Sequence, residues 1–501
     1  MAVSLKHVSL KSTLLGARGV DVVHFRGIPY AEIPKRFAAS RRIAQMSSEL
    51  DCRNFGPRCP QVEVDSRYLL RIPKIIELPK EEEDELACTN LDVCVPDGHA
   101  GVAGKHKLPV LLWIHGGSQA VTFGSAKSGI CDPTKLVQQS VKLDKPMIVV
   151  NVQYRLNVFA LSDGKGPANL ALRDQRLALD WVQDHIEGFG GDPAAVTVYG
   201  ESAGGVYAHA HLVSKAPAKQ FILSSGSLFL SPPQPPQNVV NIRKLVGQKL
   251  EAIKLGANLE DAPVKLLVEA VKAAGISSFF LQQEEILENW QASMGDATRL
   301  LLTDVQKEAI IWQEGMWFTT AQDLVGAFDK VGAASDSLKH LYHVHEDRPS
   351  SSKTGALDFI NDYKFLLPVE VLREQWSKAG KPVFRGVFDE LNPWQPSTGA
   401  HHAIDVVLLF EGIDLSFSPA AQRTAATMRK AWIDFVSGSD PWDASRGYYG
   451  FGPHGSCHLL DDAELRSRRR LSAMETLRKI DTKALDATLV TLAAGKISLL
   501  N

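Results

Sequence analysis

Residues 195–213, AVTVYGESAGGVYAHAHLV, are the stretch that decides the fold. The apolar run Ala195–Tyr199 is typical of a buried strand, and Gly205–Val213 has the pattern of a helix. Between them lies Gly200-Glu201-Ser202-Ala203-Gly204, whose small residues allow a sharp turn from strand to helix. Such a turn raises the central side chain above the carboxyl edge of a sheet, so we predict that Ser202 is an exposed nucleophile. A Gly-Ser turn without chemistry is the alternative.

Short apolar runs of the same kind recur on both sides of this turn. They are Leu108–Ile114, Met147–Tyr154, Phe221–Leu223, Leu300–Thr303 and Val383–Phe388. Largely apolar runs of this length are typical of parallel strands that helices cover on both faces. The segment Asp174–Ile186 has the apolar spacing of one such helix. The sequence therefore predicts an α/β fold with a central, mostly parallel sheet.

Length and one biased segment indicate the domain organisation. A chain of 501 residues fits one large α/β domain or two moderate ones, and the series of strands favours a single domain over residues 1–501. Ser231–Gln237 is rich in proline, and Asn241–Ala274 is amphipathic and mostly helical in pattern. Helices inserted between late strands usually lie over the active face of such a sheet. Residues 228–298 are therefore a candidate helical cap.

Charge and composition limit the classes of partner. The chain has 55 Lys and Arg against 57 Asp and Glu, a formal net charge of -2, and 45% hydrophobic residues. This balance excludes intrinsic disorder and gives no support to a nucleic-acid partner, so we expect a small molecule. With six cysteines and no Cys-x-x-Cys, we expect no disulfide scaffold, no metal and no cofactor.

No segment predicts membrane insertion or secretion. The apolar runs are far shorter than the roughly 20 residues that cross a bilayer. The N-terminal stretch is interrupted by Lys6, His7 and Lys11, unlike the apolar core of a secretory signal. We therefore expect a cytoplasmic protein without a membrane span, and the sequence leaves its oligomeric state open.

A second turn supplies donors for the oxyanion that forms when a serine attacks a carbonyl. His115-Gly116-Gly117-Ser118 follows the predicted strand Leu108–Ile114. The backbone amides of Gly117, Ser118 and Ala203 are the expected oxyanion hole. A tight turn without a catalytic role is the alternative.

Around these two turns and through most of its length, the chain resembles the type-B carboxylesterase family, which includes cholinesterases and carboxylesterase-type lipases. The motifs follow the family order through most of the chain: Phe25–Ala31, Gly56–Gln61, Cys88–Val93, Tyr154-Arg155, Asp174-Gln175 and Phe189–Pro193. The resemblance implies an α/β-hydrolase fold, with helical cap insertions and a triad in the chain order Ser, Glu, His. It also implies that Cys59 and Cys88, which secreted relatives join, lie close in space; in a reducing cytosol we expect thiols.

The resemblance places the triad histidine in Gly399–Asp405. The family's histidine precedes a small residue, any residue and an acid, which selects His402 over its neighbour His401. For the acid, the family places a glutamate, usually followed by glycine, in a loop after the strand Leu300–Thr303. Glu308 has that place but precedes alanine, whereas Glu314 precedes glycine. Loop length favours Glu308, with Glu314 and Asp304 as alternatives.

Four further residues are predicted to border the substrate or support the triad. They are Gly116, Gln119, Glu201 and His401. Ser118 and Gln119 stand where the family commonly carries a third glycine and an aromatic residue, which adds polar groups beside the pocket. Glu201 either orders water and the serine helix or is a structural carboxylate. The arginines between Arg466 and Arg470 follow acidic residues and predict a solvated helix end.

These expectations combine into a reaction class. We predict a serine-dependent carboxylic ester hydrolase that acts on a small-molecule ester or lactone through an acyl-serine. A tailoring enzyme that transfers the acyl group or cyclises its substrate on the same triad is one alternative. A non-catalytic binding member of the fold is another, although such members lose the nucleophile that remains here at Ser202.

Overall fold

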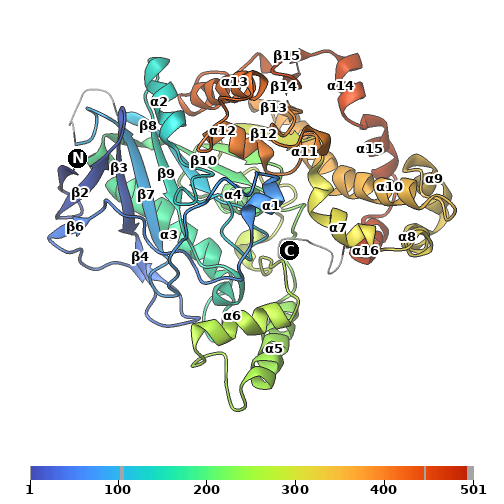
Figure 1. Cartoon of the computed structure of the whole chain (residues 1–501), viewed down its shortest axis with the longest axis horizontal. Coiled ribbons are helices and arrows are strands. Elements are labelled where there is room, and N and C mark those ends of the chain that lie inside the picture. Colours follow the sequence, from blue (N-terminus) through green and yellow to red (C-terminus); the bar gives the residue numbers. More distant parts are fainter. Residues whose placement is uncertain (1, 102–106, 445–446, 494–501) are drawn as a thin grey trace.

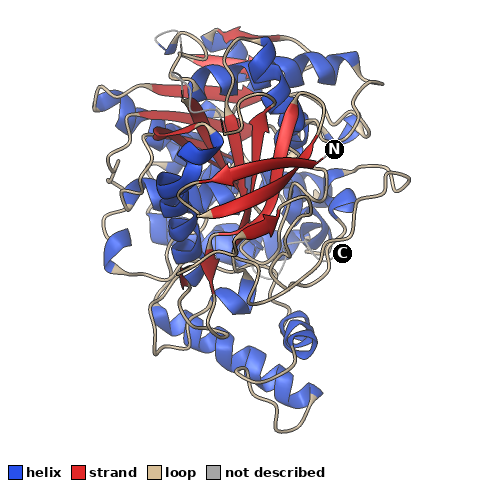
Figure 2. Cartoon of the chain, turned by 90° about the vertical axis from the view of Figure 1, so that its left-hand side faces the viewer, coloured by secondary structure: helices blue, strands red, loops and turns tan. Residues whose placement is uncertain are grey.

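The computed structural model describes residues 2–101, 107–444 and 447–493 and is organised around one large twisted sheet (Figures 1 and 2). Within these residues the strand order is β1-β2-β3-β7-β9-β8-β10-β11-β12-β13-β14-β15, with β6 beside β2. The strands are β1 (Ala2–His7), β2 (Ser12–Arg18), β3 (Val22–Pro29), β6 (Glu49–Asp51), β7 (Asn90–Pro96), β8 (Leu108–Ile114), β9 (Ile148–Val152), β10 (Gly191–Glu201), β11 (Gln220–Ser224), β12 (Arg299–Val305), β13 (Val383–Phe388), β14 (Tyr448–Phe451) and β15 (Cys457–Leu460). A separate pair is formed by β4 (Ala31–Glu32) and β5 (Arg41–Arg42).

The central strands are parallel, as the apolar runs predict. Every neighbouring pair from β9 through β14 in the sheet is parallel, and antiparallel strands flank this block at both edges. All the predicted strands are present, and Leu108–Ile114 and Val383–Phe388 agree residue for residue. The α/β-hydrolase fold expected from the resemblance is thus confirmed.

Helices cover both faces of the sheet. They are α1 (Ser66–Leu70), α2 (Thr134–Lys142), α3 (Leu170–His185), α4 (Ala203–Val213), α5 (Pro236–Ile253), α6 (Val264–Ala273), α7 (Gln313–Trp317), α8 (Ala321–Phe328), α9 (Ser335–Leu341), α10 (Pro349–Asn361), α11 (Leu367–Lys378), α12 (Ile404–Phe410), α13 (Pro419–Val436), α14 (Asp462–Arg468), α15 (Leu471–Leu477) and α16 (Thr482–Ala493). Among the described residues, no helix combines the length and apolarity that crossing a membrane requires.

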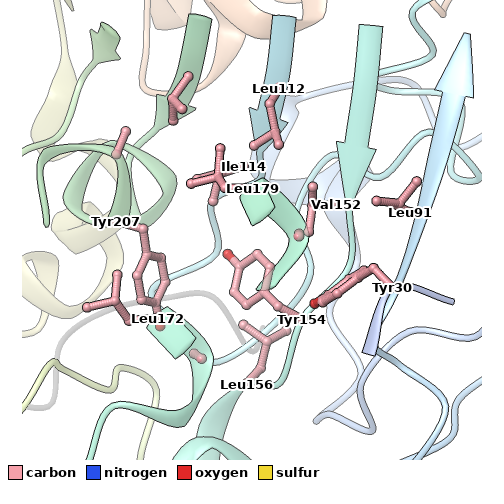
Figure 3. Close-up of a cluster of buried hydrophobic side chains, with 14 of the residues drawn as sticks. Tyr30, Leu91, Leu112, Ile114, Val152, Tyr154, Leu156, Leu172, Leu179 and Tyr207 are labelled. Atoms are coloured by element: carbon pink, nitrogen blue, oxygen red, sulfur yellow. The ribbon is translucent and has the colours of Figure 1, made fainter. Parts of the chain in front are cut away.

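The alternation of side chains along β8 divides the core into two layers. Leu112 and Ile114 pack in a buried cluster with side chains of α3 and α4, part of which is drawn in Figure 3. Leu111 and Trp113 point the other way and pack with α12 and α13. Because successive strand residues face opposite sides, an uninterrupted apolar run fills both layers at once.

Two helical excursions leave the carboxyl side of the parallel strands. The first connects β11 to β12 and contains α5 and α6, which pack on each other and extend away from the sheet at the bottom of Figure 1. The predicted helical stretch Asn241–Ala274 is thus two helices, the first of which begins at Pro236. The second excursion, residues 306–382, holds α7 to α11 and shares a separate apolar core with α15 and α16. The sequence pattern of residues 306–382 does not delimit this second excursion.

Five of the six cysteines and one of the late arginines, Arg469, are buried. All six cysteines are free thiols, and the buried Cys59 and Cys88 lie close enough to affect each other, as the resemblance implies. The solvated helix end predicted from the arginines is wrong for Arg469, which is buried between Asp304 and Asp389 at 2.7 and 2.8 Å. Carboxylates from two distant strand ends neutralise this arginine, so its charge does not need water.

Candidate active site

Ser202 lies at the sharp turn between β10 and α4. Its backbone has φ 56° and ψ -122°, a conformation that non-glycine residues rarely adopt. The glycines on either side are required by packing: a Cβ on Gly200 would lie 2.0 Å from the carbonyl oxygen of Gly204, and one on Gly204 would lie 2.1 Å from that of Ile114. The predicted strand–turn–helix at Ser202 is therefore present, but the serine is not exposed on the surface as predicted: it is 8% exposed and lines two adjoining cavities.

His402 and Glu308 meet although 94 residues separate them. The Nδ1–H of His402 donates to Oε2 of Glu308 at 2.6 Å, and both side chains are buried. Glu308 begins a short 3₁₀ helix after β12; its other carboxylate oxygen accepts from the amide of Val305 at 2.8 Å. Because both oxygens of this carboxylate have a partner, the ring of His402 is held in one orientation, which leaves Nε2 as the nitrogen that can accept a proton.

Backbone hydrogen bonds hold the two loops that carry this pair. The amide of Lys307 donates to the carbonyl of Ala400 at 2.9 Å, and the amide of His402 donates to the carbonyl of Lys307 at 3.2 Å. The amide of Glu308 donates to the side chain of Asn361 at 2.7 Å. Asn361 is not predictable from the sequence, because an isolated asparagine on a helix carries no recognisable pattern.

The structure places the alternative triad residues elsewhere. His401 accepts a hydrogen bond at Nε2 from Asn392 at 2.8 Å and donates from Nδ1 to the carbonyl of His402, and burial lowers the pKa of its ring to about 4. Asp304 is paired with Arg385 and Arg469. Glu314 lies on α7 and lines a separate cavity with Trp317 and Phe318. Of the candidate acids, Glu308 is the one bonded to His402.

The serine and the imidazole share a small cavity of about 30 Å³, which Gly117 and Glu201 also line. Within the described part of the chain, no hydrogen bond joins the Ser202 hydroxyl to His402. Nε2 of His402 instead lies 3.3 Å from Oε1 of Glu201. In enzymes without bound substrate, such catalytic hydrogen bonds are often long and tighten only when substrate binds.

The electrostatics of the cavity are dominated by carboxyl groups around one imidazole. Burial raises the pKa of Glu201 to about 8, and burial together with the charge of Glu308 raises the pKa of Asp405 to about 7. Burial alone would lower the pKa of His402, but the charges of Glu201 and Glu308 outweigh it and raise this pKa to about 9. The charges of Glu201, His402 and Asp405 thus act on one another, so a change in protonation at one of them alters the proton affinity of the others.

The turn after β8 presents amide groups to the same cavity. The carbonyl of Gly117 is occupied by the amides of Ala120 and Val121 at 2.9 and 3.0 Å, and that of Ser118 by the amide of Phe279 at 2.9 Å. Ser118 and Gln119 both have left-handed backbones, with φ 55° and 59°. Among the described residues, no acceptor binds the amides of Gly117, Ser118 or Ala203. The turn thus directs carbonyls away from the site and leaves donors free for an oxyanion.

Comparisons with known proteins agree with this arrangement. The model of the carboxylesterase family matches residues 11–310 and 260–456. Lipase 3 of Yarrowia lipolytica is 28% identical over 94% of this chain and 96% of its own length. The para-nitrobenzyl esterase of Bacillus subtilis is 28% identical over 83% of this chain and 86% of its own. A solved structure titled PNB esterase superposes with a TM-score of 0.72 at 24% identity, covering 93% of this chain and 98% of that one. The chain belongs to the carboxylesterase family.

Proposed function

We propose that the protein hydrolyses small carboxylic esters or lactones through an acyl-serine, with Ser202 as nucleophile, His402 as general base and Glu308 as the acid of the triad. The observation that carries the proposal is the 2.6 Å hydrogen bond between His402 and Glu308 beside a cavity that Ser202 also lines. Membership of the carboxylesterase family and the likeness to lipases and an esterase support the reaction class.

Each step follows from the positions of these groups. Glu308 holds the proton on Nδ1 of His402, so Nε2 takes the hydroxyl proton of Ser202 as its oxygen attacks the ester carbonyl. The amides of Gly117, Ser118 and Ala203 stabilise the oxyanion. His402 then gives its proton to the departing alcohol and leaves an acyl-serine. Water, deprotonated by the same nitrogen, attacks this ester and releases the acid and the free serine.

Glu201 has a supporting part in this proposal. Its carboxyl group lies 3.3 Å from Nε2 of His402 and is buried. An imidazolium forms at this nitrogen in each half-reaction, and a neighbouring carboxylate stabilises it. The sequence leaves two roles open for Glu201. Its contact with Nε2 of His402 favours a role beside the reacting groups over a purely structural one.

The proposal is tested by measuring turnover of p-nitrophenyl esters of graded acyl length, with and without a competing alcohol. We expect hydrolysis to the free acid by the wild-type chain and a fall of about 10⁵-fold or more in kcat for Ser202→Ala. Thermal unfolding of both proteins checks that the variant is folded. Equal turnover by the folded Ser202→Ala variant would contradict the proposal, and accumulation of a new ester with the alcohol would favour acyl transfer.

A further inference from the structure

The larger of the two cavities beside Ser202 has a volume of about 400 Å³, which is the size of a typical small-molecule site. Its walls come from parts of the chain that are distant in sequence. The oxyanion turn contributes Gln119, the first excursion contributes Ser231 and Phe279, the second contributes Trp312, and α16 contributes Leu489. Most of this lining is apolar, so the few polar side chains in it stand out.

Gln119 and Ser231 are two polar residues of this lining that contact each other, and Tyr207 contacts Gln119 from α4. The Tyr207 hydroxyl donates to Oε1 of Gln119 at 3.1 Å, and Nε2 of Gln119 donates to Oγ of Ser231 at 3.5 Å. The second contact is at the outer limit of a hydrogen bond. Within the described residues, Nε2 of Gln119 has no other acceptor, although the side chain is 4% exposed. A buried amide with spare donors favours a ligand that carries an acceptor.

The amide of Gln119 is held in place by neighbours that are themselves fixed. Its backbone carbonyl accepts from the amide of Asn157 at 2.8 Å. Tyr207 is buried on α4, where its ring packs edge-to-face on Tyr154 at 5.4 Å; both rings are labelled in Figure 3. A rigid donor of this kind discriminates between ligands, because it loses little conformational entropy on binding.

The mechanism indicates which part of the substrate meets Gln119. His402 protonates the departing alcohol, so the alcohol leaves on the side of the small cavity that His402 lines. The 400 Å³ cavity touches Ser202, Ser118 and Ala203, and His402 is not among its described lining residues. The acyl group therefore extends into the larger cavity, toward Gln119.

We propose that Gln119 selects esters whose acyl chain carries a second acceptor oxygen, an ether, a ketone or a hydroxyl, within reach of its amide nitrogen. This inference rests on the proposed esterase function and goes beyond it by naming the substrate class. An apolar acyl chain would leave the amide nitrogen with only its long 3.5 Å contact to Ser231. A chain with an oxygen at the matching position satisfies it.

The test compares matched pairs of p-nitrophenyl esters in which one ether oxygen replaces one methylene at successive positions of the acyl chain. Each kcat/KM ratio, ether over alkyl, is divided by the same ratio for hydroxide hydrolysis. We expect a preference of about tenfold for the ether at one position in the wild-type chain. Gln119→Met should bring this ratio close to one, mainly through KM, and Tyr207→Phe should lower it in part because the amide loses its partner.

Gln237→Met, at an exposed glutamine on α5, is the matched control and should keep the wild-type ratio. Two results would overturn the inference while the esterase proposal stands. One is hydrolysis of the alkyl esters without any preference for the ether esters, and the other is a preference that neither Gln119→Met nor Tyr207→Phe changes. If no ester is hydrolysed by the wild-type chain, the proposed function fails and the inference fails with it. If Gln119→Met does not fold, the ether-over-alkyl kcat/KM ratio of Tyr207→Phe alone tests the inference.

Discussion

Two buried charged clusters lie at the carboxyl ends of β12 and β13, and they differ in the balance of their charges. In the arginine cluster, Asp304 contacts Arg385 and Arg469 at 2.6 and 2.7 Å, and Arg469 also contacts Asp389 at 2.8 Å. Burial alone would raise the pKa of Asp304, but the two guanidinium groups lower it below its ordinary value. Every charge in this cluster is neutralised by an opposite charge. The cluster therefore links the strand ends to the segment after α14, and its groups keep their ordinary charged forms.

In the second cluster, His402 is surrounded by more carboxyl groups than its single positive charge can neutralise. Glu308 holds one ring nitrogen, Glu201 faces the other, and Asp405 is buried nearby. The pKa values of Glu201 and Asp405 are raised to about 8 and about 7. Similar burial thus gives opposite results in the two clusters. A cluster with equal numbers of opposite charges stabilises the fold. A cluster with an excess of carboxyl groups holds protons that a reaction at the site can use.

The largest effect that this comparison predicts is on turnover in the His402 cluster. Glu308→Gln should lower kcat by about 10⁴-fold, because the amide no longer fixes the tautomer of His402 or stabilises its charged form. The measurement is kcat on a p-nitrophenyl ester, with circular dichroism as a check of folding.

Glu314→Gln is the matched control for this change, since Glu314 lies on α7 and lines a different cavity from His402. It should leave kcat within about threefold of wild type. If Glu314→Gln abolishes turnover and Glu308→Gln does not, the acid of the triad is misassigned.

The second prediction concerns stability in the arginine cluster. Arg469→Met should lower the free energy of unfolding by about 3 to 5 kcal/mol, since it removes a buried cation from Asp304 and Asp389. Denaturant unfolding measures this change. Arg466→Met, at an exposed position of the same helix end, should change it by less than about 0.5 kcal/mol. Unaltered stability of Arg469→Met with a large loss of kcat would place this cluster in the chemistry instead.

The third and smallest effect is on pH dependence. His402 must be neutral to accept the proton of Ser202, and its pKa is raised to about 9, so kcat/KM should rise with pH through that range. Glu201→Gln removes a negative charge that raises this pKa, and the acid limb should move to lower pH. Asp405→Asn should move it in the same direction by less, because its charge contributes less to the pKa of His402. Superimposable profiles for all three proteins would show that these carboxyl groups do not act on His402.

The sequence predicted the parts of the site that depend on short segments. The parallel strands followed from largely apolar runs, and the position of Ser202 followed from small residues that the tight turn requires. The second excursion was missed because its short amphipathic helices carry no pattern that separates them from surface helices. Arg469 was misread because nothing near it in the chain shows that Asp304, 165 residues away, lies against it.

By itself, the sequence determined a strand–turn–helix with a serine at its apex, a turn of free amides after an earlier strand, and an α/β sheet that carries both. Only the tertiary structure decided which carboxylate meets His402, which arginine is buried and which side chains line the larger cavity beside Ser202. The physical reason is that local backbone conformation depends on neighbouring residues. These pairings depend instead on the register of β12 beside β13, and the connection between these two strands is the whole second helical excursion.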